Sequence, residues 1–289
     1  MASSRVCLIT DASSGFGLLL AKHAASRGER VIAASRNPEK LKLDEAAGIR
    51  TVRLDPNQTL EEIKAVMKDI VAIYGTIDAV VNNAGYVQTG ILEEVTPEAT
   101  FRQFQVNTFG PLNVYRAVLP YLREKKYGTL VTIGDGGLVS HAALRWLAIG
   151  LADEVASFGI CHCLIEPGFF RTELLNPNAN IASTGSTERI PDYSEMQRRI
   201  AIFLSSMARS WVTPLRVWRL SMMLLLPRDT LRGGICRVFA LGSDATAEIS
   251  KSASQTLANL NDWKEISAIS DFPEGQSRIY ELRLLYRVL

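Results

Sequence analysis

Short apolar runs alternate with amphipathic stretches along the first 165 residues of the chain. Apolar runs typical of buried strands occupy residues 5–9, 30–34, 50–54, 78–81, 129–133 and 160–165, and stretches with helical spacing occupy 16–27, 59–74, 98–125 and 143–157. In the stretch 59–74, apolar residues form one stripe from Leu60 to Ile73. Repeated strand–helix–strand units predict one α/β domain over residues 1–289, a doubly wound parallel sheet with helices on both faces. Ligands are then expected at the carboxyl ends of the strands.

Composition narrows the class of protein. The chain has 289 residues, a net charge of +2 and four cysteines, which gives no sign of a nucleic-acid surface or a disulfide scaffold. No apolar run is long enough to span a bilayer, and the first strand leaves no room for a secretory signal, so we expect a cytoplasmic protein. Cys161 and Cys163 flank His162, but alternation along a strand separates them, which favours a core strand over a metal site.

A turn with two closely spaced glycines follows the first predicted strand and leads directly into a helical pattern; it reads Thr10-Asp11-Ala12-Ser13-Ser14-Gly15-Phe16-Gly17. Glycines here let the backbone approach a pyrophosphate, and the helix N-terminus offers free N–H groups. Ser13 and Ser14 are suited to cap the helix or to donate to phosphate. The Asp11 carboxylate opposes this, because it repels phosphate. A turn that binds nothing stays the alternative.

Polar residues follow the next strands. Arg36 favours a ribose 2′-phosphate, where an acidic residue would favour the 2′-hydroxyl; the alternative is a solvated surface arginine. Asp55 either accepts a hydrogen bond from an adenine amine or caps the helix that follows. The segment 82–85, with Asn83, follows the fourth strand at the expected height of the ribose. Asn107 lies inside a predicted helix, where asparagine is unfavourable, and indicates either a functional bend or a plain buried amide.

These motifs together resemble the classical short-chain dehydrogenases and reductases. They are the turn at residues 10–17, the segment 82–85, Asn107 and the segment 167–172, and residues 36–41 are similar to the NADP-preferring branch. The resemblance covers about residues 5–200 and returns over about 239–274. It implies a Rossmann-like fold, an NADP cofactor and hydride transfer to or from a carbonyl or alcohol of a small organic molecule. Fungal-type members suggest secondary-metabolite biosynthesis, and family members often form homo-oligomers.

The resemblance also assigns roles to individual positions. Cofactor-binding positions would be Ser13, Gly15, Phe16, Gly17, Arg36, Asp55, Asn83, Arg116, Phe170 and Thr172. Within this set, the glycines and Phe16 would line the phosphates, and Phe170 and Thr172 would contact the nicotinamide end. Asn107 would hold a helix bend and a proton-relay water.

The expected catalytic residues are not in place. The family uses a serine after the fifth strand and a tyrosine followed four residues later by lysine, whereas this chain has Gly134-Asp135, His141 and Arg145 at the corresponding positions. His141 and Arg145 would share a helix face, with His141 as proton donor and Asp135 orienting it or acting as base. The alternative is that they are remnants beside a deletion. Tyr121 and Lys125 have the right spacing but are expected to be a surface pair before the wrong strand.

Residues 198–237 differ from the rest, with eight arginines, no lysine and one acidic residue, Asp229, and with no clear helical or strand period. This stretch is interpreted as a membrane-surface or partner-binding segment, as an unusual substrate lid, or as the product of a shifted reading frame or misplaced exon boundary. Residues 278–289 share the last interpretation. The chain is thus expected to be an NADP-dependent reductase or dehydrogenase by lineage. The alternative is a catalytically impaired pseudoenzyme or a non-redox isomerase or cyclase.

Overall fold

The computed structural model describes residues 4–41, 48–134, 139–168, 181–183, 189–207 and 238–264. The chain divides into two units, residues 1–246 and 247–289, and each is described by itself. Among the residues expected at the site, Asp135, Phe170 and Thr172 lie outside the described part.

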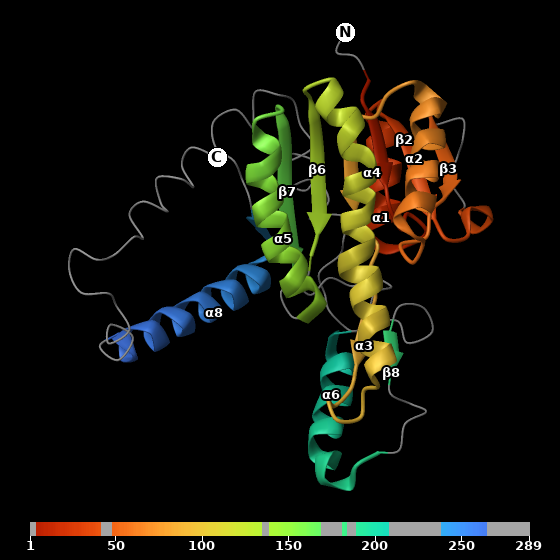
Figure 1. Cartoon of the computed structure of the whole chain (residues 1–289). Helices are drawn as coiled ribbons and strands as arrows, with labels where there is room; N and C mark the ends of the chain where they lie inside the picture. Colours follow the sequence, from red (N-terminus) through yellow and green to blue (C-terminus); the bar gives the residue numbers. More distant parts are fainter. Residues whose placement is uncertain are drawn as a thin grey trace, which may run out of the picture. The chain divides into compact units, whose positions relative to one another are not determined.

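The strands of the first unit form a seven-stranded parallel sheet in the order β3-β2-β1-β4-β6-β7-β9 (Figure 1). Their bounds are β1 Val6–Ile9, β2 Arg30–Ser35, β3 Ile49–Arg53, β4 Ala79–Asn82, β6 Gly128–Ile133, β7 Ile160–Pro167 and β9 Val238–Leu241. Two short strands, β5 Val87–Thr89 and β8 Ile181–Ser183, pair in parallel in a separate sheet. The strand order reverses direction between β1 and β4, which confirms the predicted doubly wound α/β sheet.

Helices connect the strands. The α-helices are α1 Gly15–Ser26, α2 Leu60–Tyr74, α3 Pro97–Phe104, α4 Gly110–Glu124, α5 Val139–Ala156, α6 Ser194–Met207 and α8 Ser243–Asp262. A π-helical segment, Gln105–Phe109, joins α3 to α4, and short 3-10 turns span Pro38–Lys40 and Pro191–Tyr193. None of the described helices is both long and apolar enough to cross a membrane.

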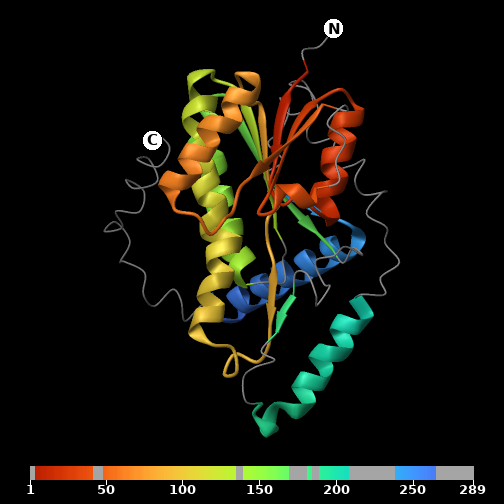
Figure 2. The same ribbon diagram turned by 90° about the vertical axis from the view of Figure 1, so that its right-hand side faces the viewer.

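Strand side chains alternate between two cores, one on each face of the sheet. Cys7, Ile9 and Val31 pack with α1, whereas Leu8 and Ile32 pack with α2 and α4. Figure 2 shows α1 on one side of the sheet and α2 and α4 on the other. Helices on both faces are therefore confirmed, and they follow from the period of two along each strand.

Besides shifts of one or two residues at strand ends and the division of the predicted helix 98–125 into α3, a π-helical segment and α4, three features differ from expectation. Helix α5 begins at Val139 rather than residue 143, because its buried stripe of Leu144, Ala148 and Ala152 continues one turn back to Ser140. The paired strands β5 and β8 are too short to give a sequence pattern. The arginine-rich stretch 198–237 was expected to lack a helical period, but its first ten residues belong to α6.

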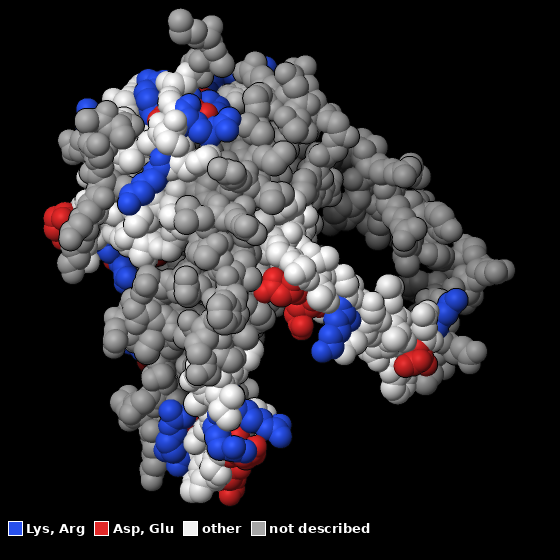
Figure 3. Space-filling model, turned by 180° about the vertical axis from the view of Figure 1, so that it is seen from behind, with Lys and Arg blue, Asp and Glu red and all other residues white. Residues whose placement is uncertain are grey.

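The positive charge along α6 is partly offset within the helix itself. Arg198 and Arg199 pair with Glu195 at 2.8 and 3.2 Å on the exposed surface, and Figure 3 shows side chains of both signs there. The part of α6 that the structure describes is thus not a uniformly basic face. Residues 208–237 lie outside the described part of the chain.

Candidate functional site

The candidate site lies where the strand order reverses, at the carboxyl ends of β1 and β4. Thr10 ends β1, and its Oγ1 accepts hydrogen bonds from the backbone N–H groups of Asn83 (2.9 Å) and Ala84 (3.0 Å). The Asn83 amide donates to the carbonyl oxygens of Thr10 (3.1 Å) and Asp11 (3.2 Å). The structure therefore gives Asn83 a local role, which is to fix the turn after β1 against the end of β4.

The turn has the backbone conformation that its glycines predict. Gly15 has φ +52°, in the left-handed region that glycine adopts readily. Gly17 is buried, and a Cβ there would lie 2.3 Å from the carbonyl oxygen of Asp11 and 2.7 Å from the amide nitrogen of Asn83. A side chain at position 17 would thus push α1 away from the turn, so the close approach requires glycine.

Asp11 fits the turn better than its charge suggests. It has φ +48°, a conformation that Asp tolerates better than most residues. Its carboxylate accepts a hydrogen bond from the exposed Ser13 hydroxyl at 3.1 Å. Burial raises the pKa of the Asp11 carboxyl, and the Ser13 hydrogen bond and the Arg36 charge act in the opposite direction. The neighbouring guanidinium offsets part of the repulsion that a phosphate would meet.

Ser14 is the N-cap residue of α1, and its side chain makes no capping hydrogen bond.

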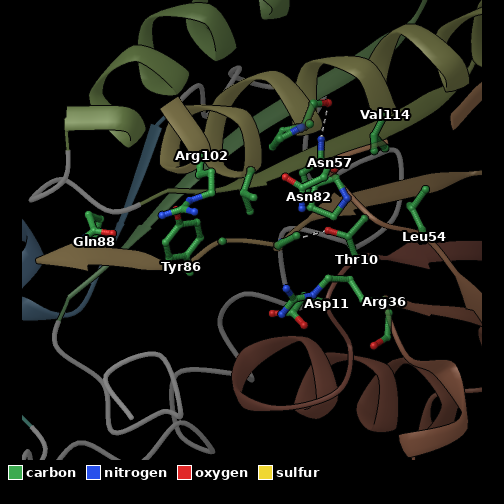
Figure 4. A pocket seen from close by; sticks show the side chains of 17 residues that line it. Thr10, Asp11, Arg36, Leu54, Asn57, Asn82, Tyr86, Gln88, Arg102 and Val114 are labelled. Carbon is green, nitrogen blue, oxygen red and sulfur yellow. Dashed lines mark hydrogen bonds between the residues drawn. The ribbon is translucent and has the colours of Figure 1, made fainter. Parts of the chain in front are cut away.

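A cleft of about 330 Å³ opens beside this turn. Its floor comes from the ends of β1, β2 and β4, and α3 and α4 form one wall (Figure 4). Arg36, at the end of β2, lines it and is exposed. Apolar contact comes from Leu54 and Val114, which lie together at one side of the picture. A cleft with apolar walls and an arginine beside a glycine turn can hold a phosphorylated nucleoside.

Asp55 and Arg116 are not among the cleft-lining residues. Asp55 Oδ1 accepts hydrogen bonds from both the backbone and the side-chain nitrogen of Asn57, each at 2.9 Å, and it is Asn57 that lines the cleft. The alternative role for Asp55 as a helix cap is wrong, because Thr59 caps α2 in a reciprocal capping box with Glu62. Arg116 lies on the exposed face of α4 and donates to Asn113 at 2.8 Å.

Asn107 lies in the π-helical segment that interrupts the long helix predicted over residues 98–125. It is fully buried in the π-helical segment, where one extra residue per turn directs its side chain toward the loop after β4. Its Oδ1 accepts from the Tyr86 N–H at 3.0 Å, and its Nδ2 donates to the Tyr86 carbonyl at 2.8 Å. The same Nδ2 donates to the Ser140 hydroxyl at 3.1 Å. Asn107 therefore ties the loop after β4 to the first turn of α5.

Ser140 was not among the predicted site residues, because the predicted helix began three residues later. It is fully buried, and its carbonyl also accepts a hydrogen bond from Thr108 Oγ1 at 2.9 Å. A signal does exist, since Ser140 precedes Leu144 and Ala148 at the four-residue spacing of the buried stripe. The residue that meets Asn107 is thus a serine on α5.

Arg145 and His141 both lie on α5. Arg145 Nη1 pairs with Glu166 Oε2 at 2.6 Å, and the Glu166 side chain on β7 is 3% exposed. This ion pair joins α5 to the end of β7, and Arg145 is not among the residues that line the described cleft. His141 belongs to the first turn of α5, and only its backbone is described.

A small apolar hollow of about 20 Å³ lies at the other side of the turn. It is lined by Phe16 and Leu20 of α1, by Asn83, and by the ends of the strands β6, β7 and β9, which contribute Ile133, Ile165, Pro167 and Leu241. Phe16 thus borders this small apolar hollow and is not among the residues that line the larger cleft.

Two sequence patterns that resemble a catalytic pair or a metal site, Tyr121 with Lys125 and the segment 161–163, make contacts that stabilise the fold. Lys125 was expected in a surface pair with Tyr121, but it is partly buried, pairs with Asp78 Oδ1 at 2.5 Å and also donates to the Ile77 carbonyl. These contacts lie at the amino end of β4, opposite the cleft. Along β7, Cys163 packs into the α1 core while His162 contacts Tyr115, so alternation separates them as predicted.

Comparisons with known proteins agree with this geometry. A sequence model of the family described as short chain dehydrogenase matches residues 5–137. Oxidoreductase BOA17 of Botryotinia fuckeliana is 31% identical over 92% of this chain and 99% of its own length. A 3-oxoacyl-[acyl-carrier-protein] reductase of Thermotoga maritima is 32% identical over 72% of this chain and 93% of its own.

Solved structures extend the likeness to three dimensions. A short-chain dehydrogenase from Streptomyces avermitilis superposes with a TM-score of 0.79 and 32% identity, over 93% of this chain and 99% of that one. A gluconate 5-dehydrogenase from Burkholderia cenocepacia, in complex with NADP and tartrate, gives a TM-score of 0.55 and 28% identity over 59% and 73%. On sequence, sheet order and site geometry together, the chain belongs to the short chain dehydrogenase family of oxidoreductases.

Proposed function

We propose that the protein is an NADP(H)-dependent oxidoreductase that interconverts a carbonyl and an alcohol of a small organic molecule. The observation that carries the proposal is Arg36 at the cleft, beside the glycine turn at the point where the strand order reverses. Two similar solved structures, the gluconate 5-dehydrogenase and a metagenomic short-chain oxidoreductase, are complexes with NADP.

The residues of the cleft suit this cofactor. Gly15 adopts the left-handed conformation of the turn, and Gly17 lets the amino end of α1 pack closely against it. The free N–H groups at this helix end favour the negative charge of a pyrophosphate. Arg36 presents the fork of donors that a 2′-phosphate accepts. When bound, NADP(H) supplies or accepts the hydride at the carbonyl carbon. Ser13, Phe16 and Asn83 support this cradle, and we keep Asp55, Arg116, Phe170 and Thr172 as the less direct candidates.

The proton that accompanies hydride transfer needs a donor in the chain. His141 in the first turn of α5 is the candidate that we retain, with Asp135 as its orienting group, because neutral imidazole and imidazolium interconvert near neutral pH. Asn107 acts as a positioning residue, since it fixes the start of α5 through Ser140. Arg145 is engaged with Glu166 and acts, if at all, through its charge.

The test is carbonyl-dependent oxidation of NADPH by the purified full chain, followed by absorbance with a panel of aldehydes, ketones and 3-oxo acids. We expect consumption with at least one class and a loss of at least about a hundredfold in His141→Ala, which is the lower end of general-acid effects. NADPH that binds without turnover across the panel would instead support a catalytically impaired protein. The oxidoreductase names of the relatives do not favour that alternative.

The cellular setting that we propose is the cytoplasm, with a role in secondary metabolism. The cytoplasmic setting rests on the small number of cysteines in the sequence, and the metabolic role rests on the resemblance to fungal-type members. Association of copies into a homo-oligomer also stays a prediction, which light scattering of the purified chain would check.

A further inference from the structure

The cleft continues beyond the part suited to a nucleotide and ends in a polar group of side chains. Tyr86 lies in the loop after β4, Gln88 in β5 and Arg102 in α3, and all three line the cleft. In Figure 4 they lie together at one side, and Leu54 and Val114 lie at the opposite side. The nucleotide cradle of the glycine turn and Arg36 uses none of these three side chains.

We propose that Arg102 and Tyr86 form a subsite that binds the carboxylate group of the substrate. The substrate would then be a small organic acid that also carries the reacting carbonyl or alcohol. The role of the bound acid as substrate rests on the proposed function, whereas the binding of a carboxylate at Arg102 and Tyr86 does not.

The position of Arg102 follows from the helical wall. Arg102, Val106, Gly110 and Val114 recur every four residues, and all four line the cleft. At a rise of 1.5 Å per residue, Arg102 stands about 18 Å along this wall from Val114. A ligand group at Arg102 is therefore well separated from one that packs on Leu54 and Val114.

The guanidinium of Arg102 has donors to spare. Its side chain is exposed, and no described carboxylate lies within ion-pairing distance of it. Its guanidinium lies beside the Tyr86 side chain in the cleft (Figure 4). Of the five N–H donors of an arginine, those not used toward Tyr86 can form the planar fork that matches a carboxylate.

Charge favours a monoanion here. The charged side chains that line the described cleft are Asp11, Arg36 and Arg102. The charge of Arg36 acts on the Asp11 carboxylate, so Arg102 is the cation left for a ligand at the other side. A single cation neutralises one carboxylate, whereas a phosphate would leave uncompensated charge in a partly enclosed site.

Tyr86 is held in position as the second donor. Asn107 binds both its N–H and its carbonyl, so the backbone that carries the phenol is fixed by a buried amide. Burial raises the pKa of the Tyr86 hydroxyl, and Arg102 opposes the shift only in part. The phenol therefore stays protonated near neutral pH and can donate to a carboxylate oxygen.

The test compares two probes that differ at the carboxyl group, acetoacetate, which is an anion, and methyl acetoacetate, which is a neutral methyl ester. Each is titrated calorimetrically into the full chain with and without saturating NADP⁺. We expect acetoacetate to bind more tightly than the ester by about tenfold or more, the effect of a charge-assisted hydrogen bond. Arg102→Gln should remove the difference, and Tyr86→Phe should reduce it. The matched control is Arg27→Gln, which removes the same charge from an exposed position at the end of α1 and should leave the preference unchanged.

Three results would overturn the subsite. The first is equal or undetectable binding of the acid and the ester, and the second is an unchanged preference for the acid in Arg102→Gln. The third is a variant Arg102→Gln that loses only its affinity for NADP⁺, because that result would assign Arg102 to the cofactor. If NADP⁺ fails to bind while the acetoacetate preference still depends on Arg102, the proposed function fails and the subsite stands.

Discussion

Gly17 is the residue on which the shape of the glycine turn depends most. A Cβ at this position would overlap the Asp11 carbonyl oxygen and the Asn83 amide, which are themselves joined by a hydrogen bond of 3.2 Å. We predict that Gly17→Ala destabilises the fold by about 1–3 kcal/mol, the usual cost of overpacking a well-packed site. Thermal unfolding measures this directly.

Gly150 provides the matched control for that substitution. It lies inside α5 with open space on its side-chain side, since, apart from the backbone of its own helix, none of the described residues has a heavy atom within 4 Å of the position that a Cβ would take. Gly150→Ala should raise stability by up to about 1 kcal/mol through helix propensity. Equal behaviour of the two variants would contradict the close approach at Gly17.

His162 is expected to make stability depend on pH. Its Nε2 shares a 2.9 Å hydrogen bond with Thr132 Oγ1, and Nδ1 has no partner among the described residues. Burial lowers the pKa of His162 from 6.5 to about 4. The unfolded chain therefore takes up a proton before the folded chain does, so this contribution to stability is complete above pH 6.5 and is lost as pH falls toward 4.

The size of the effect follows from linkage. Between pH 7 and pH 5 the native state should lose about 2 kcal/mol through His162 alone. Urea unfolding of the protein and of His162→Gln at both pH values isolates this loss, because the carboxylates titrate in both chains. A variant with the same pH dependence as the native chain would show that His162 is not the group responsible.

Among the elements, α6 is held by one buried carboxylate. The Glu94 side chain is 0% exposed and accepts hydrogen bonds from Arg189 Nη1 at 3.1 Å, from the Ile190 N–H at 3.0 Å and from Gln197. These bonds attach the start of α6 to the loop after β5. Because the contacts are local, their loss should open this segment without unfolding the sheet.

We predict that Glu94→Gln accelerates amide hydrogen exchange over residues 189–207 by about tenfold or more, because it weakens charge-assisted hydrogen bonds in a buried setting. The control is Glu93→Gln, whose carboxylate bonds only the exposed Tyr193 hydroxyl among the contacts described, at 2.9 Å. Exchange measured by mass spectrometry should change little in the control. Equal protection in both variants would contradict the role of Glu94.

The sequence predicted six of the seven strands of the parallel sheet, because continuous apolar runs and helical stripes are strong there, but it did not predict β9. It failed where the structure depends on contacts between distant residues. Strands β5 and β8 exist only through pairing of residues about ninety positions apart, and three residues carry no readable pattern. The start of α5 was placed too late because Ser140 is buried by hydrogen bonds to Asn107 and Thr108, which polarity alone does not reveal.

Only part of the candidate site was predicted, because the rest again depends on contacts between distant residues. Gly15, Gly17 and Asn107 could be singled out from the sequence, because the backbone conformation at each of them depends on nearby residues. The ion pair of Arg145 with Glu166 and the place of Arg102 in the cleft depend on how α5, β7 and α3 come together. No motif marks them, so geometry was needed to find them.

For the whole molecule, the sheet order brings the glycine turn, Arg36 and Asn107 to one edge. They come from three separate segments of the chain, and only a doubly wound parallel sheet places all of them at carboxyl ends of strands or in the adjoining wall. The family assignment and the cleft therefore support each other. The proposed function depends most on which cofactor the cleft binds.

The affinity of the full chain for NADP⁺ relative to NAD⁺ tests this most directly. Because Arg36 offers charge-assisted hydrogen bonds to a 2′-phosphate, calorimetric titration should show NADP⁺ bound about tenfold to a hundredfold more tightly. Arg36→Gln should bring the two affinities together. Failure of the chain to bind either nucleotide, or a preference that survives in Arg36→Gln, would contradict the proposed cofactor site.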